Sequence, residues 1–494
     1  MGRMRRGKAV LALALLTGAA ALGLGGCMAV ERQPGTEEDR SLGTPLETGE
    51  SQSPDRSLET EESRSLERSP GTEESQSLER SPETEEDPGL GAAPDLEDIR
   101  QPSPLPAQYD LREDGAGPWI RDQGDQNTCW AFASVTALET SMEEEKRIPL
   151  SADHMIHKNS AGLTAAAGGD YSLSWAYLLS WQGPVAEADD PYGDHASPDG
   201  LSPVCHVQTV KLLGEKDYDA IKRAVYETGG VQSSLYLPEQ GGRDRSAYFY
   251  DGDHEANHDV VIVGWDDSYP REAFSPQPEG DGAFLCANSW GEDFGDRGFF
   301  YVSYEDTQIG RHNVSYAGVE NTENYSRIFQ TDLCGWTGQL GYGKEEAWCA
   351  NVYEAEEKGT VEAAGFYAMV PDTEYALYGA AVPGDMETGE VLSGLGGERM
   401  PLLASGRLGE AGFYTVPFEA PVEVRAGSRF AVALWIRSPG TDQPVAIEYN
   451  GGGRWGNVDI TDGEGYISPD GTQWMRAEEK EACNVCLKAY GNGA

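Results

Sequence analysis

Three residues of the 494-residue chain have side chains that together could carry out nucleophilic catalysis: Cys129, His258 and Asn288. A thiolate attacks carbonyl carbon, and an imidazole within hydrogen-bond reach can take the thiol proton and later protonate a leaving group. A single cysteine is more often a packed core residue than a nucleophile, so the chemistry depends on the base. Among the seven histidines, His258 is the strongest candidate because it opens "HDVVIVGWDD", a run typical of a buried strand.

The elements expected around these residues would hold them rigidly. Residues 129–147, "CWAFASVTALETSMEEEKR", place apolar side chains at helical spacing and predict an amphipathic helix with Cys129 in its first turn. Unsatisfied N–H groups and the positive end of the helix dipole favour an anion there and lower a thiol pKa. Asn288 ends the first strand of "GAFLCANSWGEDFGDRGFFYVSY", where its side-chain carbonyl could orient the imidazole.

Three blocks in this order resemble the signature blocks of the papain-like (C1-type) cysteine peptidases: "QGDQNTCWAF", "NHDVVIVGW" and "NSWGEDFGDRGFF". The resemblance implies that Cys129 is the nucleophile, His258 the acid–base group and Asn288 its orienting partner. Gln123 would donate from its side chain into an oxyanion hole shared with the backbone N–H of Cys129. Trp290 would border the substrate site and shield the His258–Asn288 bond from water. We expect neither a cofactor nor a metal.

The same resemblance implies where a protein or peptide substrate would bind. Gly168 and Gly169, which lack side chains, would let an extended substrate pair with the backbone as an added strand. Asp259 follows the catalytic histidine and would border the pocket for the second substrate residue on the acyl side. A carboxylate there would favour Lys or Arg, unless it turns outward or is neutralised by Arg243 or Arg245.

The cleft wall departs from the family pattern. Gln126 stands where the family usually has a disulfide cysteine, and the partner cysteine near Gly168 is also missing. We therefore expect packing alone to hold this wall. Asn127 is bulkier than the glycine usual at its position and could narrow the cleft, which leaves the primary specificity open.

The N-terminal region predicts export and anchoring. Residues 1–26 have a basic front, an apolar stretch and small residues before Cys27, and "LGGC" resembles a bacterial lipobox. A lipid on Cys27 would make the protein extracytoplasmic, lipid-anchored to the cell membrane and exposed on the bacterial surface; the alternative is an ordinary cleaved signal.

Residues 27–102 repeat phrases such as "SLERSPGTEES" and predict a disordered acidic linker. The net charge of −47 makes nucleic-acid binding improbable.

Two folded domains are expected after the linker. Residues 103–318 should form the α+β papain-like two-lobed catalytic domain. Residues 325–494 contain short alternating strands separated by Gly, Pro and Asp turns, which predict an all-β antiparallel sandwich. "AGFYAMVPDTEY", "RAGSRFAVAL" and "GYISPDGTQW" resemble the lectin-like domain behind papain-like domains in bacterial surface proteins. A carbohydrate ligand could stack on tryptophans, although such residues more often pack in the core; the four candidates are Trp336, Trp348, Trp455 and Trp474.

The sequence determines less about the remaining cysteines. An exported location permits disulfides, but their pairing cannot be read from the sequence. The pair in "CNVC" at Cys483 is interpreted as structural thiols, because no second ligand pair has zinc-like spacing.

The leading function is a surface-anchored cysteine endopeptidase. A transglutaminase-like acyl transferase would leave the "NSWG" block unexplained. A surface adhesin or carbohydrate-binding protein with a weakly active or inactive peptidase domain is the third possibility.

Overall fold

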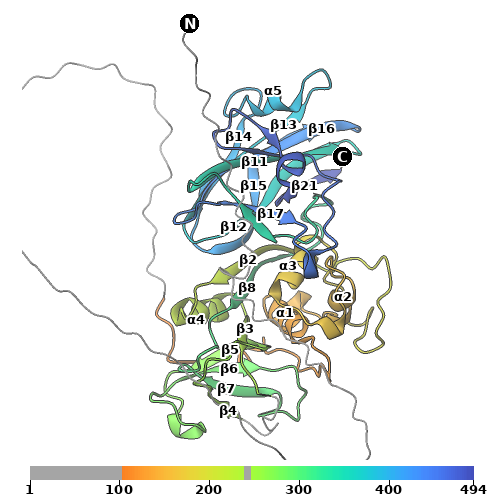
Figure 1. Ribbon diagram of the computed structural model, residues 1–494. Helices are drawn as coiled ribbons and strands as arrows, with labels where there is room; N and C mark the ends of the chain where they lie inside the picture. The colour runs from red at the N-terminus through yellow and green to blue at the C-terminus, as the bar shows by residue number, and fades with distance from the viewer. Residues whose placement is uncertain (1–102, 239–245, 494) are drawn as a thin grey trace, which may run out of the picture. The chain divides into compact units, whose positions relative to one another are not determined.

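The computed structural model describes residues 103–238 and 246–493 (Figure 1). The proposed lipidation site at Cys27, the acidic linker, Arg243 and Arg245 lie outside these residues. The N-terminal half combines helices with a sheet, and the C-terminal half consists almost entirely of strands. Within the described ranges, no helix has the length and apolar character needed to cross a bilayer.

Cys129 begins the central helix α1 (Cys129–Thr140), as the sequence predicts. Every residue of α1 is buried, so the expected amphipathic helix extending to Arg147 is wrong in length and in exposure. The reason is that α1 lies between other elements and contacts β5, α2 and α3. Even Glu139 is buried, and it forms an ion pair with Arg121 in which Arg121 Nη2 and Glu139 Oε1 are 2.5 Å apart. The other helices of this half are α2 (Ala152–His157), α3 (Tyr171–Leu179) and α4 (Tyr218–Glu227).

The sheet of the N-terminal half positions the other two residues. His258 is the first residue of β5, whose next seven residues are buried, and Asn288 directly follows β6. β5 pairs antiparallel with β3 on one side and with β6 on the other. The strands of this half are β1 (Gln108–Asp110), β2 (His206–Leu213), β3 (Val231–Leu235), β4 (Ala247–Tyr248), β5 (His258–Asp266), β6 (Ala283–Ala287), β7 (Phe299–Ser303) and β8 (Asn313–Glu320).

The C-terminal half is an antiparallel sandwich, as predicted. One of its sheets has the order β14-β13-β16-β11-β18-β19 and faces the strands β15-β12-β21-β9, and buried side chains from both sets form a common core. A small sheet, β10-β17-β20, completes it. Its elements are β9 (Arg327–Phe329), β10 (Gly338–Leu340), β11 (Glu346–Ala355), β12 (Gly359–Ala368), β13 (Thr373–Val382), α5 (Thr388–Leu392), β14 (Leu402–Leu408), β15 (Ala411–Val424), β16 (Ser428–Arg437), β17 (Val445–Tyr449), β18 (Gly465–Ser468), β19 (Met475–Arg476), α6 (Ala477–Glu481), β20 (Cys483–Val485) and β21 (Leu487–Gly493).

The two halves share a sheet, which the sequence does not indicate. β2 of the N-terminal half pairs antiparallel with β15 of the C-terminal half, with Val210 opposite Phe413. One sheet of twelve strands therefore runs β4-β7-β6-β5-β3-β8-β2-β15-β12-β21-β9, with β1 beside β5. Backbone hydrogen bonds thus connect the strand that carries His258 to the sandwich through a few intervening strands.

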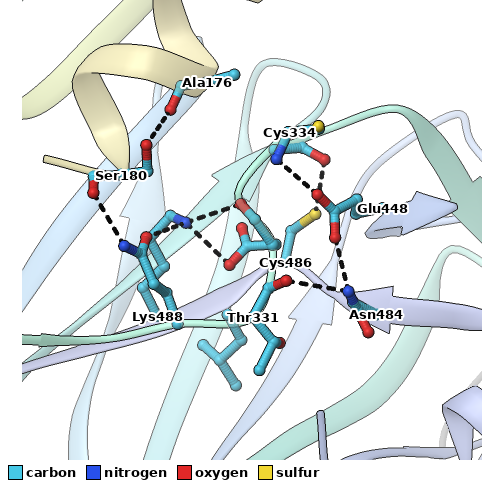
Figure 2. A network of polar contacts seen from close by, with 12 residues as sticks. Ala176, Ser180, Thr331, Cys334, Glu448, Asn484, Cys486 and Lys488 are labelled. Carbon is cyan, nitrogen blue, oxygen red and sulfur yellow. Dashed lines mark hydrogen bonds and ion pairs between the residues drawn. The ribbon is translucent and has the colours of Figure 1, made fainter. Parts of the chain in front are cut away.

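A buried polar network makes a second connection between the halves (Figure 2). Lys488 on β21 donates from Nζ to Asp332 Oδ1 at 2.9 Å and to Gln330 Oε1 at 2.9 Å. Gln330 in turn donates to the backbone carbonyl of Ser180, the residue after α3, at 2.9 Å. Lys488 is only 1% exposed, so its charge depends on these acceptors rather than on water.

The six other cysteines in the described ranges are all free and buried. Burial raises the pKa of the Cys205 and Cys483 thiols to about 12, which makes them poor nucleophiles. The interpretation of "CNVC" as structural thiols stays a prediction.

The four tryptophans considered for sugar binding are all half-buried. Trp336 packs against Tyr367, with ring centroids 5.9 Å apart, and Trp348 packs against Tyr378 at 5.6 Å. Trp474 donates from its indole to the carbonyl of Gly471 at 3.1 Å. These tryptophans have structural contacts, so sugar stacking on them stays a prediction.

Candidate active site

Cys129 lies at the exact start of a helix, with Thr128 as the N-cap residue. At this position the backbone N–H has no intrahelical acceptor and the positive end of the dipole favours a thiolate. The side chain is completely buried. The thiolate is the form of this side chain that acts as a nucleophile.

His258 and Asn288 are hydrogen-bonded, with His258 Nε2 and Asn288 Oδ1 2.7 Å apart. The backbone N–H of Ser289 also donates to this oxygen, at 2.8 Å, and fixes the direction of the Asn288 carbonyl. The ring of Trp290 packs against His258 with centroids 4.9 Å apart. Burial lowers the pKa of His258 to about 4, and the Asn288 bond acts in the opposite direction. An imidazolium here consequently needs a negative partner such as a thiolate.

Gln123 is held by the residue that follows Asn288. Ser289 Oγ donates to Gln123 Oε1 at 2.6 Å, and the Gln123 backbone N–H donates to the Ser289 carbonyl at 2.8 Å. Gln123 Nε2 donates one bond, to the carbonyl of Gln126 at 2.7 Å, and an amide nitrogen has a second N–H to offer. Tyr192 adds a hydrogen bond from its hydroxyl to the Gln123 carbonyl at 2.8 Å.

A buried glutamine links the elements that carry Cys129 and His258. Gln232 on β3 donates from Nε2 to the carbonyl of Trp130, at 3.4 Å, and to Asp259 Oδ2, at 2.9 Å. Its own carbonyl accepts from Ser134 Oγ at 2.8 Å. Because Trp130 follows Cys129 and Asp259 follows His258, this side chain fixes the position of α1 against β5.

The sequence suggests that Asp259 borders an open pocket, but in the structure its carboxylate is buried and hydrogen-bonded to other residues of the protein. It is 4% exposed and accepts hydrogen bonds from Ser234 Oγ at 2.6 Å and from Gln232 at 2.9 Å. The register of β3 against β5 sets Ser234 directly opposite Asp259, which explains the contact. Burial raises the pKa of the Asp259 carboxyl to about 7, against the effect of both hydrogen bonds. A preference for Lys or Arg in the substrate stays a prediction, without an exposed carboxylate to support it.

The wall that contains Gly168 and Gly169 lies against Asn127 and Trp130, which flank Cys129 in the chain. Gly168 has φ +70°, a left-handed conformation that favours glycine. A Cβ on Gly169 would lie 2.7 Å from atoms of Trp130 and Leu173, so no side chain fits there. The expectation that packing alone holds this wall needs correction, because Asn127 Nδ2 donates to the carbonyl of Ala166 at 3.2 Å. This bond spans the region where the family usually has its disulfide.

Sequence reasoning does not identify Ser289, Gln232 or Tyr192. Serine, glutamine and tyrosine occur throughout the chain, and no local pattern marks these three. Their roles depend on contacts between segments distant in sequence, such as the 166 positions between Gln123 and Ser289.

Two family models match the chain. The model "Papain family cysteine protease" matches residues 105–319, and "Lectin like domain" matches residues 328–491. The chain combines a papain-family cysteine peptidase domain with a lectin-like domain. These ranges agree with the two resemblances seen in the sequence.

Curated relatives match the peptidase domain. The chain is 27% identical over 243 residues to viral cathepsin of Heliothis zea nuclear polyhedrosis virus, a match that covers 46% of this chain and 58% of the relative. It is 27% identical over 237 residues to cathepsin S of Mus musculus, covering 45% and 64% of the two chains. The chain thus spans about three fifths of the length of these relatives.

Solved structures share the arrangement of both domains. A structure of the clostridial cysteine protease Cwp84 after propeptide cleavage superposes with a TM-score of 0.68 at 24% identity, covering 78% of this chain and 99% of the other. A structure of the protease and lectin-like domains of Cwp84 from Clostridium difficile gives 0.67 at 23% identity, covering 79% and 89%. At such identities the likeness establishes the common fold.

Proposed function

We propose that the protein is a cysteine endopeptidase that hydrolyses peptide bonds with Cys129 as nucleophile. The observation that carries this proposal is the 2.7 Å bond between His258 and Asn288, at the start of the strand adjacent to α1. A buried histidine oriented by an amide carbonyl is suited to exchange a proton with a thiol on the neighbouring helix. The family assignment of residues 105–319 supports the same function.

Acylation begins from a Cys129 thiolate and a His258 imidazolium. The sulfur adds to the scissile carbonyl carbon, and negative charge develops on the carbonyl oxygen. The backbone N–H of Cys129 and the second N–H of Gln123 donate to that oxygen. When the C–N bond breaks, His258 gives its proton to the amine, and a thioester to Cys129 remains.

Deacylation reverses the proton transfer. Neutral His258 takes a proton from water as the oxygen of that water adds to the thioester carbon. The C–S bond then breaks, releasing the acid product and restoring the thiolate. Asn288 keeps the imidazole in the same orientation through both steps, and an extended peptide would pair with the backbone along the wall that contains Gly168 and Gly169.

Reactivity of the reduced protein tests this proposal. After treatment with a thiol reductant, a peptide epoxide should label Cys129, and Cys129→Ala should lose both labelling and hydrolysis of a denatured protein substrate. Cys205→Ala is the matched control, since Cys205 is free and buried, and this variant should retain both properties. Labelling at another cysteine, or undiminished hydrolysis by Cys129→Ala, would overturn the assignment.

The same experiment separates the competing functions. An adhesin with an inactive peptidase domain predicts neither labelling nor cleavage. A transglutaminase-like enzyme predicts labelling together with amine incorporation into glutamine-containing peptides. Carbohydrate binding by the lectin-like domain can be measured separately with a glycan array, and the family assignment of residues 328–491 is its only support.

We also propose a lipid anchor at Cys27 on the bacterial surface. The support is the "LGGC" pattern after an apolar stretch, together with the fold shared with Cwp84, which is described as a surface layer associated protein. Mass spectrometry should find an acylated Cys27 at the mature N-terminus, and Cys27→Ser should release the protein from membranes. An unmodified terminus at another residue would contradict the anchor.

A further inference from the structure

The segment between α3 and β2 contains an acidic run that the proposed peptidase chemistry does not use, "EADDPYGD" at residues 187–194. In the fold this run lies against α2. Carboxylate oxygens of Asp190 and Asp194 come together with one from Asp153 on α2, and all three lie within 4.8 Å of one another.

Each of the three carboxylates uses one oxygen for a protein donor and leaves the other available. Asp153 Oδ1 accepts from the Gly193 backbone N–H at 3.4 Å, Asp190 Oδ2 from Ser197 Oγ at 2.6 Å, and Asp194 Oδ1 from the Ala196 backbone N–H at 3.0 Å. Among the described residues, the second oxygens have no hydrogen-bond donor. Three like charges in one place would repel one another unless a cation lies between them.

Asp153 supplies the independent observation that points to a ligand. Its side chain is 2% exposed, and Oδ2 is buried without a hydrogen bond. His157 Nε2 lies 3.7 Å from this oxygen, too far for a hydrogen bond, and no Lys or Arg within the described ranges pairs with any of the three carboxylates. A buried carboxylate oxygen without a hydrogen bond is costly, and a bound cation would offset that cost.

The chemistry of the ligands selects the ion. Carboxylate oxygens are hard ligands, and Ca²⁺ binds about six to eight oxygens at about 2.3–2.6 Å in a flexible geometry that carboxylates from two separate segments can meet. Mg²⁺ requires shorter bonds of about 2.0–2.1 Å in a near-ideal octahedron and gives up its water ligands reluctantly, so a site built mainly from protein carboxylates suits it less well. We propose that Asp153, Asp190 and Asp194 bind a calcium ion, whose remaining ligands are backbone carbonyls or water.

The ion would fix a loop that supports the active site. Tyr192 lies between Asp190 and Asp194 in sequence, and its hydroxyl donates to the Gln123 carbonyl at 2.8 Å. The same hydroxyl is 3.4 Å from Oγ1 of Thr128, the N-cap residue of α1, and the Tyr192 ring packs on Phe132 with centroids 4.7 Å apart. Calcium binding therefore stabilises the loop that supports both the oxyanion donor and the first turn of α1; its relevance to catalysis rests on the proposed function.

The test uses the full chain with Cys129→Ala, so that its result does not depend on peptidase activity. After removal of metals with a chelator, thermal unfolding is followed with CaCl₂ or MgCl₂ added at about 1 mM, a range in which extracellular calcium sites bind. Ca²⁺ should raise the Tm because it binds only the folded state, and Mg²⁺ should raise it less. Calorimetry on the same protein gives the affinity.

Variants locate the ion. Asp194 is exposed, so Asp194→Asn should fold normally and weaken Ca²⁺ binding about tenfold or more, and Asp153→Asn should do the same. Asp199→Asn is the matched control, because Asp199 is an exposed carboxylate in the same segment that pairs with Lys158. It should keep the full calcium response. Absence of a Tm shift, or an equal shift in Asp194→Asn and the control, would overturn the proposal while leaving the peptidase proposal untouched.

Discussion

Arg454 of the lectin-like domain forms an ion pair with Asp170, the residue that caps α3 directly after Gly168 and Gly169. Asp170 Oδ1 accepts from the Ser172 backbone N–H at 2.9 Å, so its other oxygen is available for Arg454. At the opposite end of α3, Gln330 donates to the Ser180 carbonyl. The lectin-like domain thus contacts both ends of the helix that follows the proposed substrate wall.

Arg454→Ala should raise KM for peptide substrates about fivefold, equivalent to roughly 1 kcal/mol, and change kcat less. The reason is that the Asp170 side chain is 2% exposed and would keep a buried charge without its partner, which loosens the adjacent wall. Steady-state kinetics measure the two constants separately. Arg437→Ala is the control, because Arg437 pairs with Glu374 away from the cleft and should leave KM unchanged. Equal losses in both variants would indicate general destabilisation.

Ser289→Ala should lower kcat about 10- to 100-fold with little effect on folding. Its hydroxyl donates to the side-chain oxygen Oε1 of Gln123 at 2.6 Å, and without this bond the amide is held only by its bond to the Gln126 carbonyl. A less firmly oriented amide would donate less well to the oxyanion, where a lost donor costs about 10²–10³ in rate. The alkylation rate of Cys129 by a small reagent should stay near that of the wild type, since no oxyanion forms in that reaction. Slow alkylation in Ser289→Ala would instead indicate a disturbed thiol–imidazole pair.

Local signals explain which parts of the site can be predicted from the sequence. Cys129 precedes a helical pattern, His258 opens a β-branched run and Asn288 ends another, so each position follows from its own neighbours in the chain. The strands of the sandwich are visible for the same reason, as alternating segments bounded by turns. β12, β13 and β16 lie where that alternation places them.

The parts that could not be predicted depend on distant pairings. Ser234 meets Asp259 only through the register of β3 against β5, and β2 meets β15 across some two hundred residues of chain. The exposure of α1 was mispredicted because the local sequence shows a polar face on the helix but not the partner of its charged residue. Arg121, which lies outside the helix, pairs with Glu139 and allows it to be buried. Asp153 is likewise separated from Asp190 in sequence and joins it only through folding.

Asp259→Asn should remove a pH dependence of stability between about pH 4 and pH 7. The carboxyl pKa is 3.8 in its ordinary state and about 7 when folded, because burial disfavours the charge. Folding therefore takes up a proton in this interval, and the free energy of unfolding falls as the pH rises towards 7. The stabilisation is complete below pH 3.8 and absent above the folded pKa. Urea unfolding across this range should give a flatter profile for Asp259→Asn, and parallel profiles would contradict the raised pKa.

Lys488→Met should destabilise the protein by about 3–5 kcal/mol, because it leaves the Asp332 carboxylate buried without its cation. The Asp332 side chain is fully buried and that of Lys488 is 1% exposed, so water cannot replace the lost partner. The double variant Lys488→Met/Asp332→Leu removes both charges and should recover part of this loss. Urea unfolding of the wild type, both single variants and the double variant measures the coupling. If the double variant is as unstable as the sum of the single variants, the two residues do not act as a pair, and the connection from β21 through Gln330 to α3 loses its energetic basis.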